Sequence, residues 1–402
     1  MEKLSIFTNH YYPENFRINS LSKKFSKEYE VSVVSQVPNY PKGSFYNGYS
    51  IFKKREEIID DIKVTRLPVI PRGSNVIMLT FNYLSYVFSS FLYRLFTKAK
   101  TDHVFVYITS PIFISYAALG FAKKNNAKAT LYLLDLWPGS LISMLNIKNK
   151  WLINRLEKAC IKLYKRFDNI IVSSYGFIEV LEKYGINRDK ISYIPQHADE
   201  ILVEPIYISP ILDKLKIVFT GNVGQAQNLD ILVNTAKFLK NKNFIDVKFT
   251  IVGDGRYRNQ LILNVKESGL DDYFEFVGRV DYNEIQGILA NHHFGFVSLS
   301  EDKTLSKTLP AKVQSYMAFG IPILASANEE TPYIINKSKS GVSVRANDAN
   351  ALANKIIELK GLPHKCLLEM GFNGFTYSNK NFDLDDISRK FIKIMKEGNK
   401  YV

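Results

Sequence analysis

The most informative segment of this chain is Leu309-Pro310-Ala311-Lys312-Val313-Gln314-Ser315-Tyr316-Met317-Ala318-Phe319-Gly320-Ile321-Pro322-Ile323. It predicts a helix that begins at a proline, carries Lys312 in its first turn and ends at Gly320, followed by an apolar strand over 321–325. Free backbone N–H groups, the positive end of the helix dipole and the lysine favour phosphate binding at this helix start. An ordinary capped helix that leads into a parallel strand would show the same pattern.

Outward from this helix, short β-branched and aromatic runs alternate with helical patterns along the whole chain. This alternation predicts an α/β protein with parallel sheets. Helices are expected at 151–167 and 383–396. Strands are expected at 3–7, 31–35, 62–66, 103–108, 129–134, 169–172, 191–194, 216–220, 247–252, 274–277, 294–299 and 322–325.

The alternation is interrupted once, by an apolar but aperiodic stretch that contains Pro205 and Pro210. We therefore expect an N-terminal domain over 1–200, a linker over 201–214 and a C-terminal domain over 215–380. The last segment, 381–402, is expected to carry a helix that packs back on the first domain. In parallel sheets, ligands bind beyond the carboxyl ends of the strands, so the loops that follow strands are the candidate sites.

The charge of the chain is positive and uneven. The net charge is +14, and residues 1–200 hold 28 Lys and Arg against 17 Asp and Glu. Nucleic acid, anionic lipid or a phosphate-bearing substrate would suit this half, and so would a plain solvated basic surface. The sequence has no RNA- or DNA-binding motif, so we expect no nucleic-acid partner.

Metal sites and export signals are not indicated. Cys160 and Cys366 lie far apart without metal-type spacing, and Asp383 and Asp385 are expected to open a helix, where acids favour the dipole. The N-terminus enters a strand without the apolar core of a signal peptide, which predicts a cytoplasmic protein.

The segment over 76–96 is rich in Phe, Tyr, Leu and Ile, but Asn82, several serines and Arg94 interrupt it. It is too polar for a convincing membrane span. We consider two alternatives, a helix packed on the sheet and an aromatic helix that lies in a bilayer interface. The second predicts a peripheral protein on the cytoplasmic face of the cell membrane.

Two loops of the first half carry polar side chains suited to sugar hydroxyls or a pyrophosphate. The loop after the first strand offers His10, Glu14, Asn15 and Arg17, and it lacks the G-x-G-x-x-G pattern of a dinucleotide site. A structured turn capped by Asn15 is the alternative. At the end of the strand over 129–134, Asp135 precedes Trp137 and a Pro-Gly turn.

Asp135 predicts a positioned acid or hydroxyl acceptor beside a stacking surface, although it would also serve as a cap of the next turn. His197 ends the first half in the same topological place and would equally suit a structural role.

Three glycine-containing turns follow strands of the second half, and a plain strand-to-helix turn is as good an explanation for each alone. They hold the candidates Gly221, Asn222, Gly224 and Gln227 in the first turn, Gly253 and Arg256 in the second, and Gly278 and Arg279 in the third.

Together these elements resemble the GT-B nucleotide-sugar glycosyltransferases, specifically the retaining family 4 enzymes. The first half is similar to a branch of amino-sugar transferases from O-antigen and capsule gene clusters, with N-acetyl-fucosaminyl transferases the nearest. The matching residues are Gly221-Asn222, Val252-Gly253-Asp254-Gly255, Phe276-Val277-Gly278, Pro310-x-Lys312 through Met317-Ala318-x-Gly320-x-Pro322, Tyr12-Pro13-Glu14-Asn15-Phe16-Arg17 and Asp135-Leu136-Trp137-Pro138.

The resemblance implies two Rossmann-like domains that face each other across a cleft, with the acceptor bound by the first and the donor by the second. The family's E-x7-E acids are absent, because Lys307 and Ser315 stand in their places. Its phosphate-binding Arg and Lys correspond to Asn222 and Gln227. Lys312, the helix N-terminus and Lys307 are the available substitutes, since a diphosphate needs about two positive charges or several N–H donors. Gln314 or Ser315 would hold the ribose, and Leu309 and Glu330 complete the donor set.

The reaction implied is retaining, metal-independent sugar transfer without a cofactor, with Asp135 and Lys312 as catalytic residues. The expected donor is a UDP-linked N-acetylated amino sugar such as FucNAc, and the expected acceptor is a polyprenyl-diphosphate-linked saccharide of capsule or O-antigen synthesis. His10, Glu14, Asn15, Arg17, Trp137 and His197 are the acceptor candidates. Two alternative hypotheses are a nonhydrolysing UDP-sugar epimerase of the same fold and a basic membrane- or nucleic-acid-binding protein.

Overall fold

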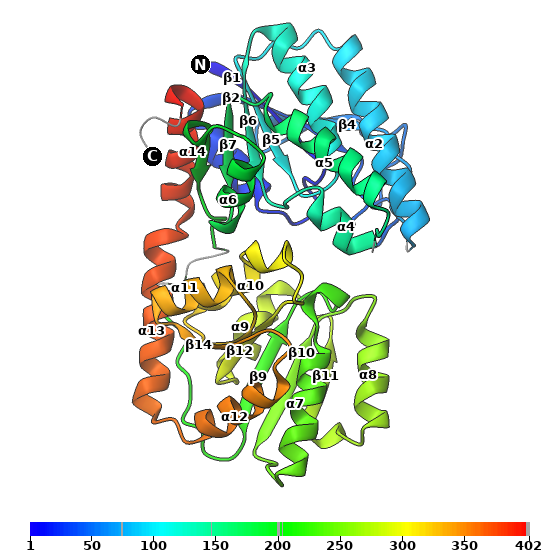
Figure 1. Cartoon of the computed structure of the whole chain (residues 1–402). Helices are drawn as coiled ribbons and strands as arrows, with labels where there is room; N and C mark the ends of the chain where they lie inside the picture. The colour runs from blue at the N-terminus through cyan, green and yellow to red at the C-terminus, as the bar shows by residue number, and fades with distance from the viewer. Residues whose placement is uncertain (74, 146, 199–201, 203, 399–402) are drawn as a thin grey trace. The chain divides into compact units, whose positions relative to one another are not determined.

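A computed structural model describes residues 1–73, 75–145, 147–198, 202 and 204–398. The chain forms two compact units, which are described separately (Figure 1). Unit 1 comprises Met1–Gln196 together with the segment from Leu384 onward, and unit 2 comprises His197–Asp383. The expected linker region, where it is described, therefore belongs to unit 2, and the expected boundary at 200/201 lies outside the described residues.

Unit 1 is built on an eight-stranded sheet with the strand order β3-β4-β2-β1-β5-β6-β7-β8. Its strands are β1 (Glu2–Thr8), β2 (Tyr29–Gln36), β3 (Glu56–Ile59), β4 (Ile62–Leu67), β5 (His103–Ile108), β6 (Lys128–Leu133), β7 (Asn169–Val172) and β8 (Ile191–Tyr193). Its helices are α1 (Ile18–Phe25), α2 (Val76–Phe96), α3 (Ser115–Asn125), α4 (Gly139–Leu145), α5 (Lys150–Tyr164), α6 (Gly176–Lys183) and α14 (Leu384–Glu397), with short 3-10 turns η1 (Ile112–Ile114) and η2 (Arg188–Lys190).

Helices cover both faces of this sheet. On one face α1 and the C-terminal α14 pack together, with Phe391 edge-on to Phe25 and Phe105 at 6.0 and 5.5 Å between ring centroids. On the other face α2, α3, α5 and α6 close a second core (Figure 1). The two apolar layers explain why the central strands are buried on both sides.

Unit 2 contains a six-stranded sheet in the order β11-β10-β9-β12-β13-β14, in which all pairings are parallel. Its strands are β9 (Leu215–Thr220), β10 (Val247–Val252), β11 (Phe274–Gly278), β12 (Phe294–Ser298), β13 (Ile323–Ser326) and β14 (Gly341–Val344). Its helices are α7 (Asp230–Asn241), α8 (Arg258–Glu267), α9 (Tyr282–Ala290), α10 (Ala311–Phe319), α11 (Glu330–Ser338), α12 (Ala349–Lys360) and α13 (His364–Asn381), with 3-10 turns η3 (Gln225–Gln227), η4 (Asp271–Tyr273) and η5 (Leu305–Lys307).

Three sequence-based expectations are corrected. The sheet of unit 1 is not wholly parallel, because β3 pairs antiparallel with β4 in a hairpin. The strand after α10 covers Ile323–Ser326 rather than 321–325, because Ile321 N–H bonds back to Tyr316 O and closes the helix end. The edge strand β14 was not predicted, since its four residues include a glycine and a serine and give only a weak strand signal.

Candidate active site

The helix α10 is attached firmly to the strand that ends at the first glycine turn. Pro310 is the N-cap of α10, and Gly320 is its C-cap, with a φ of 72°. The hydroxyl of Tyr316 accepts a hydrogen bond from Thr220 N–H at 3.0 Å, and the Thr220 hydroxyl lies 3.1 Å away. Helix α10 is thereby attached to the carboxyl end of β9.

Lys312 lies in that turn and has no internal counter-charge. Its ammonium sits 4.6 Å from the centre of the Phe219 ring, and no carboxylate among the described residues lies within ion-pair distance of it. Burial against apolar surroundings lowers the pKa of Lys312 to about 8. A half-buried cation without a partner is suited to receive an anionic ligand.

Three glycines bring the ends of neighbouring strands together beside this lysine. Gly253 N–H donates to Gly278 O at 2.7 Å, and Gly221 N–H donates to Val252 O at 2.8 Å. A Cβ on Gly221 would lie 3.2 Å from Lys312 Cε, so the lysine stem passes directly over this glycine. The structure therefore places Gly221, Gly253, Gly278 and Lys312 in one region of unit 2, the arrangement expected from the sequence.

Gly253 has the strictest requirement for glycine. Its φ is 133°, and a Cβ there would lie 1.9 Å from Gly221 O. Both the backbone conformation and the space exclude a side chain. The two turns can approach this closely only because neither carries a side chain at the point of contact.

We expect Gly253→Ala to destabilise unit 2 by at least about 3 kcal/mol, because the Gly221 carbonyl must move and the positive φ is strained. The matched control is Gly287→Ala in the exposed face of α9, where a Cβ would meet nothing within 4 Å. That change is expected to stabilise by roughly 0.5–1 kcal/mol. Urea unfolding of both variants measures the difference, and equal stability of the two would contradict this account.

In the first glycine turn, one of the two polar candidate side chains stabilises the turn itself. Gln227 Oε1 accepts a hydrogen bond from Gly224 N–H at 3.2 Å, and Gln227 O accepts one from Ser298 Oγ. Asn222 is exposed beside Gly224, where a Cβ would lie 3.0 Å from its amide nitrogen. Of the two residues that replace the family's basic pair, Gln227 is thus engaged in the turn and Asn222 is accessible.

Lys307 is neutralised within the protein, in contrast to Lys312. Its ammonium lies 2.8 Å from Glu329 Oε2, while Ser306 Oγ donates to Glu329 Oε1 at 2.7 Å. Glu329 has a φ of 54° and directly precedes α11. Lys307 would have to leave this ion pair before it could bind a phosphate, which makes it the weaker of the two lysine candidates.

The remaining donor candidates differ in accessibility. Leu309, Gln314 and Glu330 are buried and Ser315 is half-buried, while Arg256 and Arg279 are exposed. A residue that was not assigned, Arg258, opens α8 near the third turn, and a Cβ on Gly278 would lie 3.9 Å from its guanidinium. Its buried Nε has no hydrogen-bond partner among the described residues. Two arginines, Arg256 and Arg258, follow Gly255 in the sequence. Only Arg256 was predicted to be a site residue.

In unit 1 the loop after β1 is organised by a buried His–Glu pair. His10 Nδ1 and Glu14 Oε2 are 2.6 Å apart, and Glu14 Oε1 accepts hydrogen bonds from the N–H groups of Asn39 and Tyr40, each at 2.7 Å. His10 also stacks on Phe16 with 4.3 Å between centroids. Glu14 therefore ties the loop after β1 to the loop after β2, and the acceptor role predicted for it would be indirect.

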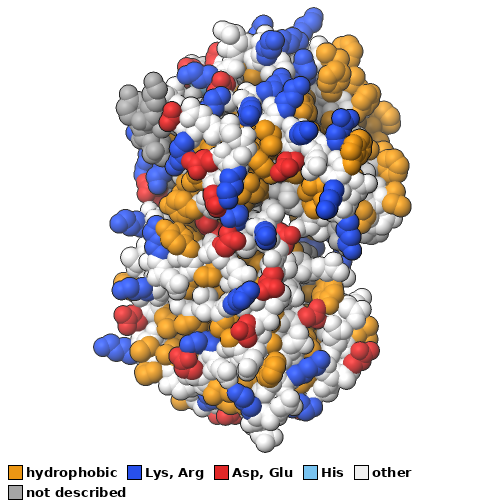
Figure 2. Space-filling model, viewed as in Figure 1, with side chains coloured by type: hydrophobic (Ala, Val, Ile, Leu, Met, Phe, Trp, Pro, Cys, Tyr) orange, Lys and Arg blue, Asp and Glu red, His pale blue; other side chains and the backbone are white. Residues whose placement is uncertain are grey.

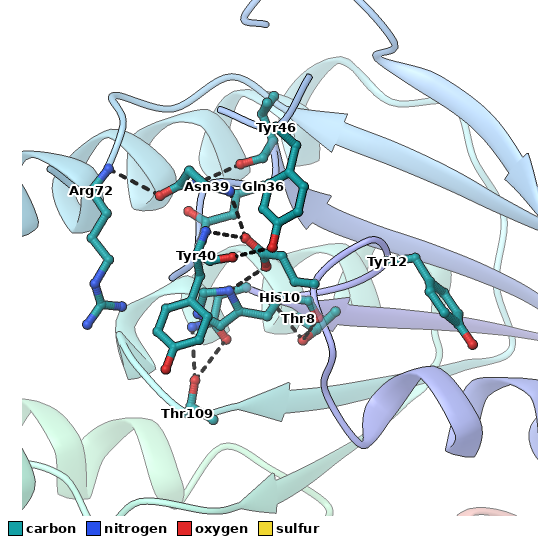
Figure 3. A network of polar contacts seen from close by, with 12 residues as sticks. Thr8, His10, Tyr12, Gln36, Asn39, Tyr40, Tyr46, Arg72 and Thr109 are labelled. Carbon is teal, nitrogen blue, oxygen red and sulfur yellow. Dashed lines mark hydrogen bonds and ion pairs between the residues drawn. The ribbon is translucent and has the colours of Figure 1, made fainter. Parts of the chain in front are cut away.

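Figure 3 shows how the neighbouring side chains gather around His10. Asn9 Nδ2 donates to Thr109 Oγ1 at 3.0 Å, which links the ends of β1 and β5. The guanidinium of Arg72 lies 5.4 Å from the centre of the Tyr40 ring, and Arg72 N–H donates to Asn39 Oδ1 at 3.1 Å. Sequence reasoning missed Arg72 and Tyr40, because both lie in loops whose pattern gives no signal before the hydrogen bonds are known.

Asp135 lies at the end of β6, near the loop after β5. The adjacent Trp137 is buried, donates from Nε1 to Ser110 Oγ at 3.2 Å and meets Phe113 edge-on at 5.7 Å. Burial raises the pKa of Asp135 to about 7. Its carboxyl is half-buried and makes no hydrogen bond with the described residues. Trp137 thus supports the turn, and Asp135 is a carboxyl that changes its protonation near neutral pH.

Three acceptor candidates are less closely tied to this cluster. Asn15 is exposed, and Arg17 is the half-buried N-cap residue of α1. His197 was expected in the N-terminal domain, but it is the first residue of unit 2, where its Nδ1 lies 2.6 Å from Ala198 O. The expectation was wrong because the chain passes from unit 1 to unit 2 between Gln196 and His197.

Across the described residues, no group of three His, Cys, Asp or Glu side chains could hold a metal ion.

Helix α2 has its polar side turned inward. Asn82 donates to Ile70 O at 2.7 Å, Tyr86 donates to Thr8 O at 2.6 Å, and Ser89 donates to Pro68 O. Its exposed side carries large apolar side chains, visible as an orange patch in Figure 2: Val76, Ile77, Phe81, Leu84, Phe88, Phe91, Leu92, Leu95 and Phe96.

By length and composition α2 is the single membrane-span candidate among the described residues, with 22% of its most apolar window buried. Its hydrogen bonds to loops and strands of unit 1 make it part of this fold. An apolar face on a helix anchored in this way is typical of a surface that meets a bilayer or a partner.

Comparison with known proteins agrees with the architecture. The domain family described as Glycosyltransferase Family 4 matches residues 17–200, and the one described as Glycosyl transferases group 1 matches residues 214–360. The sucrose-phosphate synthase structure from Thermosynechococcus elongatus superposes with a TM-score of 0.74 at 14% identity, over 99% of both chains. The Anabaena HepE structure with UDP and glucose gives 0.70 at 12%, over 99% of this chain and 100% of that one.

Curated relatives carry names from exopolysaccharide synthesis. The colanic acid biosynthesis glycosyltransferase WcaL of Escherichia coli K12 is 22% identical over 53% of this chain, and the match spans about half of that relative's length (52%). WcaI of the same strain, named a colanic acid biosynthesis glycosyl transferase, is 21% identical over 97% of this chain and 98% of its own. The fold is the GT-B fold, and the two domain matches, one in each half of the chain, support a glycosyltransferase.

Proposed function

We propose that this protein transfers a sugar from a UDP-sugar to a polyprenyl-diphosphate-linked saccharide during the synthesis of a bacterial surface polysaccharide. The observation that carries the donor assignment is Lys312, a half-buried ammonium without a counter-charge at the N-terminus of α10. The position of the helix adds its dipole and free N–H groups to this charge. HepE, which has the same fold, has been crystallised with UDP and with UDP-glucose, which supports UDP as the nucleotide of the donor.

The glycine turns supply the rest of the proposed donor site. Gly221 and Gly253 leave main chain exposed at the ends of β9 and β10, where a diphosphate can approach the backbone closely. Gly278 and Arg279 follow β11, where the base would pack against main chain. Lys312 and the α10 N–H groups would stabilise the departing diphosphate, which is the main charge developed in the reaction.

The acceptor assignment rests on the loops of unit 1. Asp135 would accept a hydrogen bond from the attacking hydroxyl, and the network around His10, Asn39 and Tyr40 would hold the acceptor sugar. We propose transfer with retention, in which the leaving phosphate takes up the proton of the acceptor. An N-acetylated amino sugar such as FucNAc is the proposed donor sugar, and no metal or cofactor is needed.

The apolar face of α2 supports a location at the cytoplasmic face of the cell membrane. Nine large apolar side chains of this one helix are exposed, while its polar side chains bind the fold. The net charge of +14 would add attraction to anionic lipids. The lipid-linked acceptor and the protein would then meet in the same interface.

A thermal-shift screen with UDP-, GDP- and dTDP-sugars tests the donor. We expect UDP-sugars to raise Tm by several degrees, because ligand at 100 times Kd stabilises by about 2.7 kcal/mol and the other two nucleotides should have smaller effects. The Lys312→Met variant should lose this shift. An equal response to all three nucleotides, or an unchanged shift in the variant, would contradict the proposal.

A further inference from the structure

An apolar groove opens between α2 and the residues that follow β5. It has a volume of about 260 Å3 and is lined by Leu84, Val87, Phe88, Phe91, Phe113, Tyr116 and Ala117. The only polar atom on these side chains is the Tyr116 hydroxyl, which lies 3.4 Å from Ala159 O and so is directed to α5. A dry apolar cavity of roughly 150 Å3 binds benzene, so this groove can hold a larger branched hydrocarbon.

One wall of the groove touches the turn that carries Asp135. Phe113, in its wall, contacts the buried Trp137 edge-on at 5.7 Å, and Trp137 bonds to Ser110 at 3.2 Å. Two residues before Trp137 stands Asp135. The groove therefore adjoins the turn after β6 that is proposed to meet the acceptor.

The segment that precedes α2 carries a positive charge. Ser85 Oγ, in the third turn of α2, accepts a hydrogen bond from Ile70 N–H at 2.9 Å, which holds the preceding segment against the helix and next to the groove residue Leu84. Arg72 belongs to this segment, and no carboxylate among the described residues pairs with it. A guanidinium at this place is complementary to a diphosphate attached to an apolar chain.

We propose that this groove binds the first isoprene units of the acceptor's polyprenyl chain, with the diphosphate toward Arg72. The inference rests on the proposed acceptor class and adds a tail-binding site to it. Leu84, Phe88 and Phe91 belong both to the groove and to the exposed side of α2, so the groove would open directly toward the lipid that surrounds the polyprenyl chain. The groove would thus select lipid-linked acceptors over free saccharides.

Binding of radiolabelled farnesyl diphosphate, measured by equilibrium dialysis, tests this site. Leu84→Trp and Val87→Phe narrow the groove and are expected to weaken binding at least tenfold. The matched control is Leu95→Trp, on the exposed side of α2 but outside the groove, which should change affinity less than twofold. Inorganic diphosphate should bind all three variants and the wild type equally, because it has no chain.

Two results would overturn the assignment. One is unchanged farnesyl diphosphate affinity in both groove variants. The other is full competition by phosphatidylglycerol vesicles, which would make the groove a general lipid contact. The UDP-induced thermal shift is recorded for each variant, both to show that it folds and to keep the two proposals separate. If UDP did not raise the Tm of the wild type, only the donor proposal would be rejected.

Discussion

Replacing Lys312 by methionine is expected to lower kcat/KM for sugar transfer by roughly 10²–10³, the usual cost of removing one charge-stabilising donor. The same change should raise the stability of the ligand-free protein. Folding moves this ammonium into apolar surroundings, where its pKa falls to about 8 from an ordinary value of 10.5. The unfolded chain therefore binds more protons between these two values, and the charged lysine costs stability at pH 7.

The two effects together distinguish a ligand-binding lysine from a structural one. A structural lysine would lose stability on replacement, because its partner would be left unpaired. Lys307→Met is the matched control, since Glu329 already neutralises Lys307 at 2.8 Å. It should reduce kcat/KM much less than Lys312→Met and should not raise Tm. A smaller effect at Lys312 than at Lys307 would reverse the assignment of the two lysines.

Proton uptake gives an independent measurement at the same site. A bound diphosphate favours the charged ammonium and so raises the pKa of Lys312. At pH 8 about half of the unliganded protein molecules carry a neutral Lys312. UDP binding at this pH should therefore take up a fraction of a proton. Calorimetric titration in buffers of different ionisation enthalpy detects this uptake, and the Lys312→Met variant should abolish it.

Asp135→Asn is expected to lower turnover by about 10–10², the cost of losing a hydrogen bond from the attacking hydroxyl to a charged carboxylate. It should also stabilise the protein above pH 7. Burial raises the pKa of this carboxyl to about 7 from 3.8, so ionisation costs folding free energy as the pH rises between these values. The gain at pH 8 is at most about 4 kcal/mol, and less where water reaches the carboxyl.

The control for this prediction is Asp168→Asn, because Asp168 accepts a hydrogen bond from Ala129 N–H at 2.8 Å at the opposite end of β6. That change should leave turnover nearly intact and should not stabilise. The wild-type rate should rise with pH up to about 7 as Asp135 ionises. Normal turnover in Asp135→Asn would exclude a direct role, and a product of inverted configuration, seen by NMR, would contradict retention.

The regular elements of this fold were largely predictable because their signals are local. The buried strands β5, β7 and β10 are rich in β-branched and aromatic residues, and their predicted bounds match the structure. The bounds expected for α2 also match. The hairpin strand β3 was missed because Glu56 and Glu57 give it no apolar alternation, and its pairing depends on the neighbouring β4.

The candidate site was predictable only where it follows from backbone geometry. Glycines at strand ends and a lysine after a helix-opening proline have a meaning that the sequence carries alone. The pairing of Lys307 with Glu329, 22 residues away, does not follow from local pattern. Nor does the proximity of Arg72 to Tyr40, which depends on how two loops meet. These tertiary contacts decide which charged residues are available to a ligand.

The orientation of α2 has a consequence for kinetics. Its outward apolar face would keep the enzyme on a two-dimensional surface, where substrate is encountered per unit area rather than per unit volume. Rates would then follow the mole fraction of acceptor in the lipid, and adding inert lipid at constant total acceptor would slow the reaction by dilution within the surface.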